Sequence, residues 1–262
     1  KIIFYDVVRW FFLATIIGLG SGLLVSFFIK LLDWGTAYSQ NFSKYFWIAP
    51  VFFITNIVLI KYLAPDAEGH GTEKVIEAIH KRAGRIRVAV IPIKLITTLL
   101  TLFSGGSVGK EGPSAQMGGG LSSLLADILK FNDEDRKKLV ICGISAGFAA
   151  IFGTPISGAV FGIEVLFVGV LLYDVLLPSF VAGITAFYIT HLMGVTRTDY
   201  HIDFTAGINE FFILKVALAG VAFGICAFLF IEVMNRTEAL TNKIKIHFLL
   251  KGLIGGSIII LI

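Results

Sequence analysis

Charged side chains are scarce in this chain of 262 residues. Asp, Glu, Lys and Arg together make up 15% of the sequence, whereas hydrophobic residues make up 56%. Soluble globular domains carry about 25% charged residues, and a globule of this length could not cover its surface with so few. A soluble enzyme is therefore excluded. The high hydrophobicity also excludes an intrinsically disordered chain. The composition indicates an integral membrane protein surrounded by a lipid bilayer.

Cysteine and net charge are also low. The two cysteines, Cys142 and Cys226, both lie in apolar segments, so the sequence predicts neither a disulfide framework nor a metal site. The net charge is +4, from 22 Lys and Arg against 18 Asp and Glu. Because this excess is small and scattered along the chain, a nucleic-acid partner is not predicted.

The sequence instead contains long segments without charged residues. A helix needs roughly 20 apolar residues to cross a hydrocarbon layer about 30 Å thick. Residues 10–29 and 175–196 meet that length. Five further segments are shorter or are interrupted by glycine and proline: 45–60, 95–108, 139–163, 216–231 and 253–262. The sequence therefore predicts a multi-pass protein of a cell membrane.

Three other pieces, 71–81, 113–129 and 155–166, are too short or too interrupted to cross a bilayer alone. In lipid, broken helices survive only where protein covers their ends or where they line a water-filled cavity. Several such pieces in one chain favour the interior of a transporter over a simple membrane anchor.

The charges of the loops predict the orientation. Basic residues cluster at 81–87, 136–138 and 243–251, and the positive-inside rule places these loops in the cytoplasm. Residues 197–209 have mixed charge and are expected outside. Lys30 and Lys44 fall on the predicted outer side and run against the rule.

Residues 105–114 carry the chemistry. An apolar stretch ends in glycines, Lys110 and Glu111 follow, and Gly112 and Pro113 open the next helix. Proline suits the first turn of a helix because its missing N–H would have no partner there. Glu111 is therefore predicted just before a helix N-terminus, where free amides and the helix dipole attract negative charge. A carboxylate in that place itself occupies an anion site.

Two other breaks have the same pattern. Two glycines flank His70 ahead of a short helix that begins near Gly71, and residues 153–155 open the helix that holds Glu164. Helix starts that point inward together would form a site for a small anion near the middle of the membrane. The sequence predicts that these two helix starts and the one at Glu111 converge.

These motifs resemble those of the CLC family of chloride channels and proton-coupled chloride transporters. Residues 109–113 match the family motif G-[K/R]-E-G-P, and residues 69–71 take the place of the family's G-S-G-I-P loop. Residues 143–155 and 161–164 resemble the stretches that follow. The likeness runs over essentially the whole chain in order and spacing.

The resemblance implies an all-α integral membrane fold, a CLC-like bundle of tilted, broken transmembrane helices built on an inverted repeat. About ten helices are expected in this chain, with the first repeat over roughly residues 1–200 and the start of the second over roughly 205–262. The family's later G-x-F-x-P loop and its anion-contacting tyrosine are not in the sequence, so the chain is expected to stop inside the second repeat.

The resemblance also implies a function: a homodimer in which each subunit moves chloride or a similar small anion through its own pathway, without a cofactor. Glu111 would be the gating glutamate, which blocks the pathway when ionised and moves aside when protonated or displaced. Glu164 matches a second carboxylate of the family and is a candidate for proton transfer. The expected anion-binding residues are His70, Gly71, Lys110 and Gly112.

Two positions depart from the family pattern. His70 stands where the family usually has a serine that contacts the anion, and relatives selective for fluoride also replace that serine. Val165 stands where proton-coupled members often carry a glutamate, which favours uncoupled flow. The alternative of a proton-coupled antiporter for fluoride or another halide therefore stays open, as does the identity of the anion.

Two enzyme interpretations fail on the sequence. Residues 143–147 satisfy the nucleophile motif G-x-S-x-G, but that motif needs a preceding strand and a nearby His and acid, whereas the flanks here are apolar and helical. A phosphate-binding loop fails around Lys110, because Ser104 replaces its first glycine and Glu111 its final Ser or Thr. No enzymatic activity is predicted. A membrane assembly subunit that transports nothing is the remaining alternative.

Overall fold

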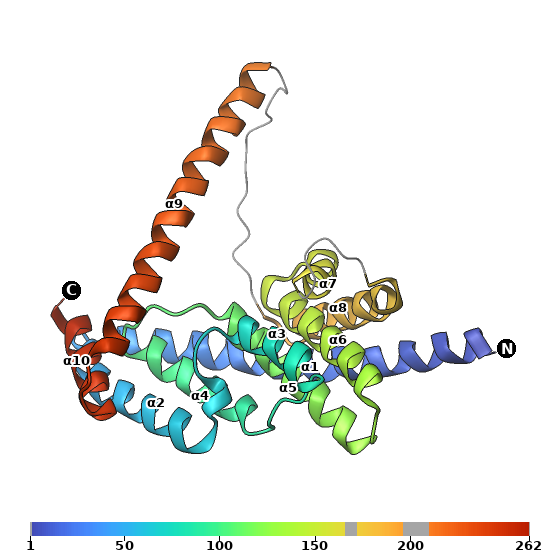
Figure 1. Ribbon diagram of the computed structural model, residues 1–262, viewed down its shortest axis with the longest axis horizontal. Helices are drawn as coiled ribbons and strands as arrows, with labels where there is room; N and C mark the ends of the chain where they lie inside the picture. Colours follow the sequence, from blue (N-terminus) through green and yellow to red (C-terminus); the bar gives the residue numbers. More distant parts are fainter. Residues whose placement is uncertain (1, 166–171, 196–209, 262) are drawn as a thin grey trace. The chain divides into compact units, whose positions relative to one another are not determined.

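The computed structural model describes residues 2–165, 172–195 and 210–261 of the chain. This part contains ten α-helices, two short 3₁₀ helices and no strand (Figure 1), which confirms the predicted all-α fold. The elements are α1 (Ile2–Gln40), η1 (Tyr45–Ile48), α2 (Ala49–Leu63), η2 (Pro65–Ala67), α3 (Gly71–Arg82), α4 (Val90–Phe103), α5 (Glu111–Ile128), α6 (Asp133–Phe152), α7 (Pro155–Glu164), α8 (Tyr173–Leu192), α9 (Glu210–Lys243) and α10 (Phe248–Leu261).

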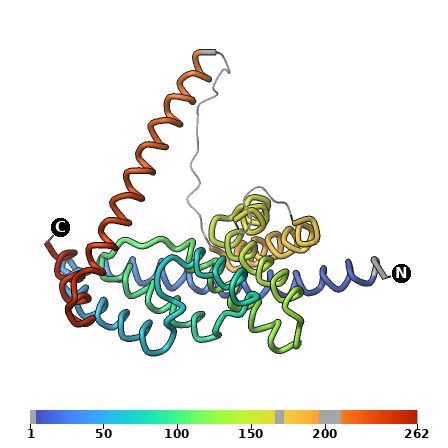
Figure 2. The backbone as a smooth tube through the Cα atoms, viewed as in Figure 1, coloured from blue at the N-terminus to red at the C-terminus, as the bar shows by residue number. Residues whose placement is uncertain are grey.

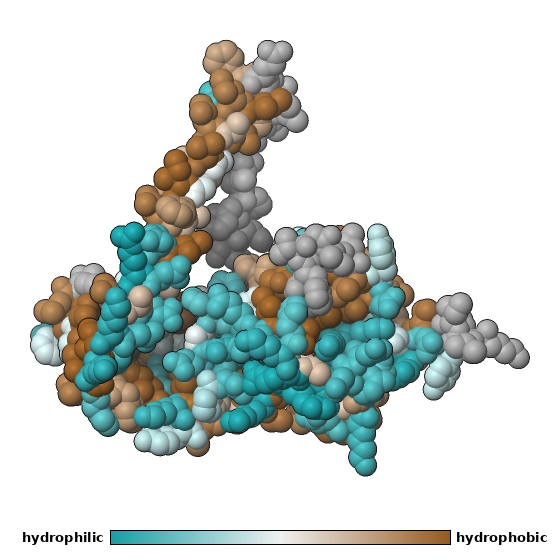
Figure 3. Space-filling model, in the orientation of Figure 1, coloured by the Kyte–Doolittle hydropathy of each residue, from teal (hydrophilic) through white to brown (hydrophobic). Residues whose placement is uncertain are grey.

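Four stretches of helix are long and apolar enough to cross a membrane. They are Tyr5–Gln40, Tyr45–Leu63, Tyr173–Leu192 and Phe211–Lys243, and α4 and α10 are shorter apolar helices. Large apolar side chains are exposed along them, such as Phe12 of α1 and Phe223 of α9. The space-filling view shows hydrophobic residues over the surface of α9 (Figure 3). Exposed apolar surface on this scale requires lipid or further apolar chain to cover it.

The helix breaks predicted from glycine and proline are present. Helices α3, α5 and α7 begin within one or two residues of the expected positions. At the last of these breaks, Gly153 ends α6 with a φ of 72°, a left-handed conformation that glycine adopts without a Cβ penalty. Pro155 then takes the first position of α7, where its missing N–H costs nothing.

The apolar segment 95–108 is helical only in its first part. Helix α4 ends at Phe103, next to the glycines where the sequence predicts the end of the helix. Gly105 follows with a φ of 85°, and the chain then leaves the helix through Gly106. The glycine pair that the sequence shows at this point therefore ends the helix before the apolar segment itself ends.

The described helices form two compact units. One contains α1 to α8 together with α10, and the other contains α9. Within the first unit, α10 packs against α2, although the two are far apart in sequence (Figures 1 and 2).

Small residues let the helices of the first unit approach closely. Gly118 of α5 and Gly143 of α6 are placed so that a Cβ on either would overlap the other's carbonyl oxygen. Gly18 and Gly22 of α1 lie in the same way against the main chain of α8. In a membrane, where apolar helices gain little by leaving lipid, close backbone packing of this kind drives association.

Ion pairs gather at the loops predicted to face the cytoplasm. Arg85, between α3 and α4, pairs with Asp133 at the start of α6 over 2.9 Å, and Arg9 of α1 pairs with Asp135 over 2.8 Å. The side chain of Asn132 caps α6 by accepting a hydrogen bond of 2.8 Å from the Asp135 amide. These contacts hold the start of α6 beside the N-terminal part of α1.

Candidate functional site

Helices α3 and α5 begin side by side. Gly71, the first residue of α3, lies so close to Gly112 of α5 that a Cβ built on Gly71 would overlap the Gly112 carbonyl oxygen. A Cβ built on Gly112 would lie 3.3 Å from the Gly71 nitrogen. Only glycine allows two main chains to approach this closely. The structure thus brings together two of the three predicted helix starts.

The first amides of both helices are free. The residues that precede the helices, His70 and Lys110, place no side-chain cap on them. The first helical bonds are made by Lys74, which donates to the His70 oxygen, and by Ser114, which donates to the Lys110 oxygen. At these two helix starts, no described residue accepts a hydrogen bond from the amides of Gly71, Thr72, Glu73, Glu111 and Gly112. Free donors at two adjacent positive helix ends suit a small anion.

The carboxylate of Glu111 is not tied to any other group. Its side chain folds back over Gly109, where a Cβ would clash with the Glu111 Oε2 atom. Glu111 is half-buried, and among the described residues its carboxylate makes neither a hydrogen bond nor an ion pair. The neighbouring Lys110, also half-buried, is not within ion-pair distance of it. A carboxylate without fixed partners, at a helix start with free amides, can move without breaking other bonds.

His70 adjoins the same place. It is exposed, its backbone is extended (φ −74°, ψ 119°), and its ring does not cap α3. His70 therefore belongs to the start of α3, and Glu111 belongs to the start of α5. The sequence singled out both residues. The structure places them at adjacent helix starts and shows no hydrogen bond or ion pair between them.

The third predicted helix start, that of α7, is packed differently, so contact between helix starts is shown for two of the three. Helix α7 packs against α6 and α8. Its start at Thr154 borders a hollow lined by Phe148, Phe152 and Phe161, which offers little to an anion. Glu164, the last residue of α7, is exposed. The glycines of α7 are used for close packing on α6 instead of for opening a polar site.

Sequence reasoning missed two side chains beside the start of α3. Lys94 of α4 is 8% exposed and donates to the carbonyl oxygens of Ala67 at 2.9 Å and Gly69 at 2.8 Å. Gln116 of α5 is 1% exposed and donates to the Asp66 oxygen at 2.8 Å. The signal available was a lysine within an apolar helix, which is costly in a membrane and usually serves a function.

Charged side chains on α3 pair with one another away from the helix start. Lys81 lies 3.4 Å from Glu77, and the hydrogen bond from Lys81, together with the charges of Lys81 and Lys74, lowers the pKa of Glu77. This carboxylate is partly exposed and lies away from the helix start. It is therefore a surface ion pair and no part of the anion site.

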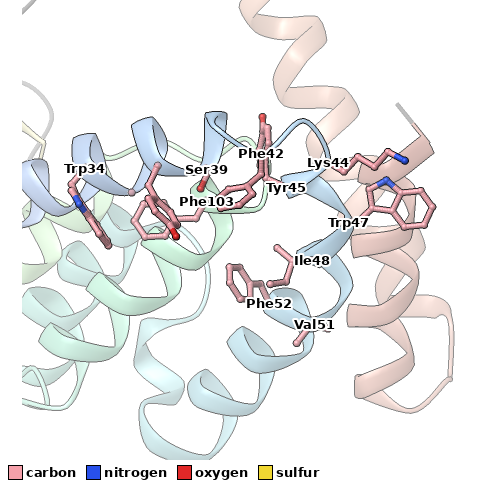
Figure 4. Close-up of a pocket in the computed structure, with 12 residues that line it drawn as sticks. Trp34, Ser39, Phe42, Lys44, Tyr45, Trp47, Ile48, Val51, Phe52 and Phe103 are labelled. Carbon is pink, nitrogen blue, oxygen red and sulfur yellow. The ribbon is translucent and has the colours of Figure 1, made fainter.

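A separate hollow of about 640 Å³ lies between α1, η1 and α2 (Figure 4). It is lined by aromatic side chains that include Trp34 and Tyr38 of α1, Phe42 of the turn after α1 and Phe103 of α4, and Lys44 is its one charged residue. Such an apolar lining is unsuited to an inorganic ion. Aromatic rings are typical of the level at which a membrane meets water.

The remaining sequence hypotheses concern metals and nucleophiles. Among the described residues, no group of three or more His, Cys, Asp or Glu side chains could hold a metal ion. Ser145, the centre of the G-x-S-x-G match, is fully buried inside α6 and donates to the Ala159 oxygen. A nucleophile elbow would place this serine on an exposed strand-to-helix turn, so the match is one of helix packing.

Comparison with known proteins decides the family. A family model described as voltage gated chloride channel matches residues 51–262, which is most of the chain. The chain belongs to this family, the CLC family. A chloride/fluoride channel protein of Pseudomonas syringae pv. tomato is 32% identical over 253 residues, which are 97% of this CLC chain and 56% of that protein. An H⁺/Cl⁻ exchange transporter, ClcA of Yersinia pestis, is 31% identical over 167 residues, 58% of this chain and 34% of that protein.

Solved structures confirm the CLC fold. A CLC-type fluoride/proton antiporter matches with a TM-score of 0.91 at 24% identity, over 98% of this chain and 65% of that one. A slow cyanobacterial Cl⁻/H⁺ antiporter matches with a TM-score of 0.79 at 23% identity, over 96% of this chain and 63% of that one. This CLC chain thus spans less than two thirds of the length of these relatives. It is a multi-pass membrane protein.

Proposed function

We propose that this chain forms part of a gated pathway that carries chloride or a similar small anion across the membrane. One observation carries the proposal: two helices begin in contact at Gly71 and Gly112, with free amides, beside a glutamate that has no fixed partner. Anion transport is also what the names of the relatives describe. Weak binding by dispersed N–H dipoles allows an ion to leave as readily as it enters, which conduction requires.

Each predicted residue has a role in this proposal. The free amides beginning at Gly71 and Gly112 bind the anion, and the His70 ring adds a further N–H donor. The charge of Lys110 attracts the anion. The carboxylate of Glu111 competes with the anion for the same amides, so it closes the pathway when it occupies them and opens it when a proton or an anion displaces it. No cofactor takes part, and the activity is transport instead of catalysis.

A second candidate is a proton-coupled antiporter that prefers fluoride. His70, in place of the usual serine, favours it, and two of the relatives above carry fluoride in their names. In this case Glu164 is the candidate for passing protons on. Val165 opposes the coupling, since proton-coupled members often have a glutamate there.

The wider organisation is also proposed. The protein would act as a homodimer with one pathway per subunit, and its helices would follow an inverted repeat, the first over roughly residues 1–200 and the second beginning at roughly 205–262. The alternative, a membrane assembly subunit that transports nothing, differs from both transport candidates in one measurable respect. It carries no anion flux.

The test is anion flux through the complete protein in liposomes, with reversal potentials under crossed chloride, fluoride and proton gradients. We expect an anion current whose dependence on pH is lost in Glu111→Gln, because the neutral amide cannot gain or lose the gating proton. Glu134→Gln is the matched control, since Glu134 is an exposed glutamate in the first turn of α6. It should behave like the unmodified protein.

Three outcomes discriminate between the candidates. A reversal potential that shifts with the proton gradient favours the antiporter, and one that ignores the proton gradient favours a channel. Unchanged flux and pH dependence in Glu111→Gln would contradict the gate. Absence of any anion flux in the unmodified protein would favour the assembly subunit.

A further inference from the structure

The segment that leads into α3 is held by its carbonyl oxygens. It runs from η2 through Gly69, whose φ is 75°, to the free amides at Gly71. The oxygen of Asp66 accepts a hydrogen bond from the Gln116 side chain of α5, and the oxygens of Ala67 and Gly69 both accept from the Lys94 ammonium of α4. Side chains from two different helices therefore fix one short piece of backbone.

This arrangement has an electrostatic consequence for the helix start. A carbonyl oxygen carries partial negative charge and repels an anion, whereas an amide N–H attracts one. Lys94 and Gln116 engage three carbonyls of the segment, so those oxygens cannot turn toward an ion at the start of α3. The N–H groups that follow are left as the groups an anion meets.

Lys94 is unusual among the described lysines. It is 8% exposed, and no carboxylate of the described residues lies within ion-pair distance of it. A buried ammonium without a counter-charge is costly, and here two backbone carbonyls are its recorded partners. Such a group persists where its position serves the protein.

Gln116 supports the same segment from α5. Its Nε2 is used on the Asp66 oxygen, while its Oε1 is buried without a hydrogen-bond partner in the described part of the chain. That oxygen would lie 3.2 Å from a Cβ built on Gly71. The Gln116 amide thus fills the space between the segment and the contact of α3 with α5.

We propose that Lys94 and Gln116 form a clamp on residues 66–69 that positions the free amides of α3 beside those of α5. They are positioning residues, acting on the anion through the backbone of this segment. The consequence for transport rests on the proposed function, but the clamp itself is a statement about the backbone and can be tested without transport.

The direct test is hydrogen–deuterium exchange of the peptide covering residues 64–74 in the complete protein. We expect Lys94→Met to speed amide exchange there roughly tenfold or more, since it removes both hydrogen bonds that hold the carbonyl oxygens of Ala67 and Gly69. Gln116→Met should also speed exchange of this peptide, because it removes the hydrogen bond to the Asp66 oxygen. This variant tests the clamp even if Lys94→Met does not fold. Lys81→Met, which removes an exposed lysine on α3 itself, is the control and should leave the peptide unchanged.

The double variant separates a clamp from two independent effects. Because both side chains hold one segment, amide exchange in the double variant should be little faster than in the single variant that exchanges faster. Unchanged exchange in both single variants, or rates that multiply in the double variant, would overturn the clamp.

Flux then tests the link to transport. Lys94→Met should raise the half-saturating anion concentration roughly tenfold, about 1.4 kcal/mol, and change the maximal rate less, while Lys94→Gln, which keeps a donor without the charge, should lose less. Normal flux in Lys94→Met despite faster exchange would show that the clamp does not serve the anion. No flux in the unmodified protein would contradict the proposed function and leave the exchange result standing.

Discussion

At Gly71, the main chain of α5 occupies the space that a side chain would need. The nearest atom to a Cβ built there is the Gly112 carbonyl oxygen, and the next is the Gly112 carbonyl carbon, so neither is the movable end of a side chain. A residue other than glycine must push the two helices apart. At Gly112 the corresponding distance of 3.3 Å is tight but can be relieved by a small shift.

This difference predicts an unequal effect of two alanine substitutions. Gly71→Ala should lower the apparent affinity for the anion at least tenfold, because overpacking costs about 1–3 kcal/mol and the cost falls on the contact that aligns the free amides. Gly112→Ala should have a clearly smaller effect. Concentration dependence of the flux measures both, with thermal unfolding in detergent as the check on folding. Equal effects, or a milder Gly71→Ala, would contradict the close approach of the two helix starts.

Some residues of the site could be predicted from the sequence, and others could not. Glu111 and Gly112 were found because an acid, a glycine and a proline in a row have one good explanation, a helix start. Gly71 was found because two glycines flank His70 ahead of a short helix. Lys94 and Gln116 were missed because their partners are backbone carbonyls of a segment 25 to 50 positions earlier in the chain. Every residue has a carbonyl group, so no residue type signals such a partner.

At the scale of helices, the sequence predicted where the helices break but not which helix each new helix start would contact. The starts of α3, α5 and α7 follow from local backbone chemistry, and the structure has all three. Which of them meet is decided by packing between helices. Gly158 and Gly162 bring α7 onto α6, whereas Gly71 and Gly112 bring α3 onto α5. Glycines look alike in a sequence whichever helix they pack against, so the sequence alone does not show which helix starts come into contact.

The cap of α6 gives a prediction for one helix. The Asn132 side chain accepts from the Asp135 amide at 2.8 Å, and three acidic residues follow in the first turn. Asn132→Ala should destabilise the protein by about 1 kcal/mol, the usual cost of losing such a cap, whereas Asn132→Asp should be nearly neutral because aspartate caps equally well. Equilibrium unfolding in mixed detergent measures the difference. Loss of stability in Asn132→Asp as large as in Asn132→Ala would show that the cap is not the cause.

At the scale of the molecule, α1 is long enough to reach from one side of the membrane to the other. It runs from Ile2 to Gln40, and at 1.5 Å per residue the stretch from Arg9 to Asn41 is about 48 Å long, more than the bilayer's hydrocarbon core of about 30 Å. The pair between Arg9 and Asp135 places the start of α6 near the N-terminal part of α1. Asn41 lies just past the other end.

Glu134, beside that ion pair, and Asn41 should therefore be accessible from opposite sides. The basic loops near Glu134 predict that it lies in the cytoplasm by the positive-inside rule, so Asn41 is expected to face outward. In a background with Cys142→Ala and Cys226→Ala, a membrane-impermeant thiol reagent should label Asn41→Cys on intact cells and Glu134→Cys only after the cells are opened. Both positions are exposed, so a failure to react would reflect the membrane and not burial. Labelling of both on intact cells would contradict the long crossing by α1, and the reverse pattern would show that Lys30 and Lys44 outweigh the other basic loops in setting the orientation.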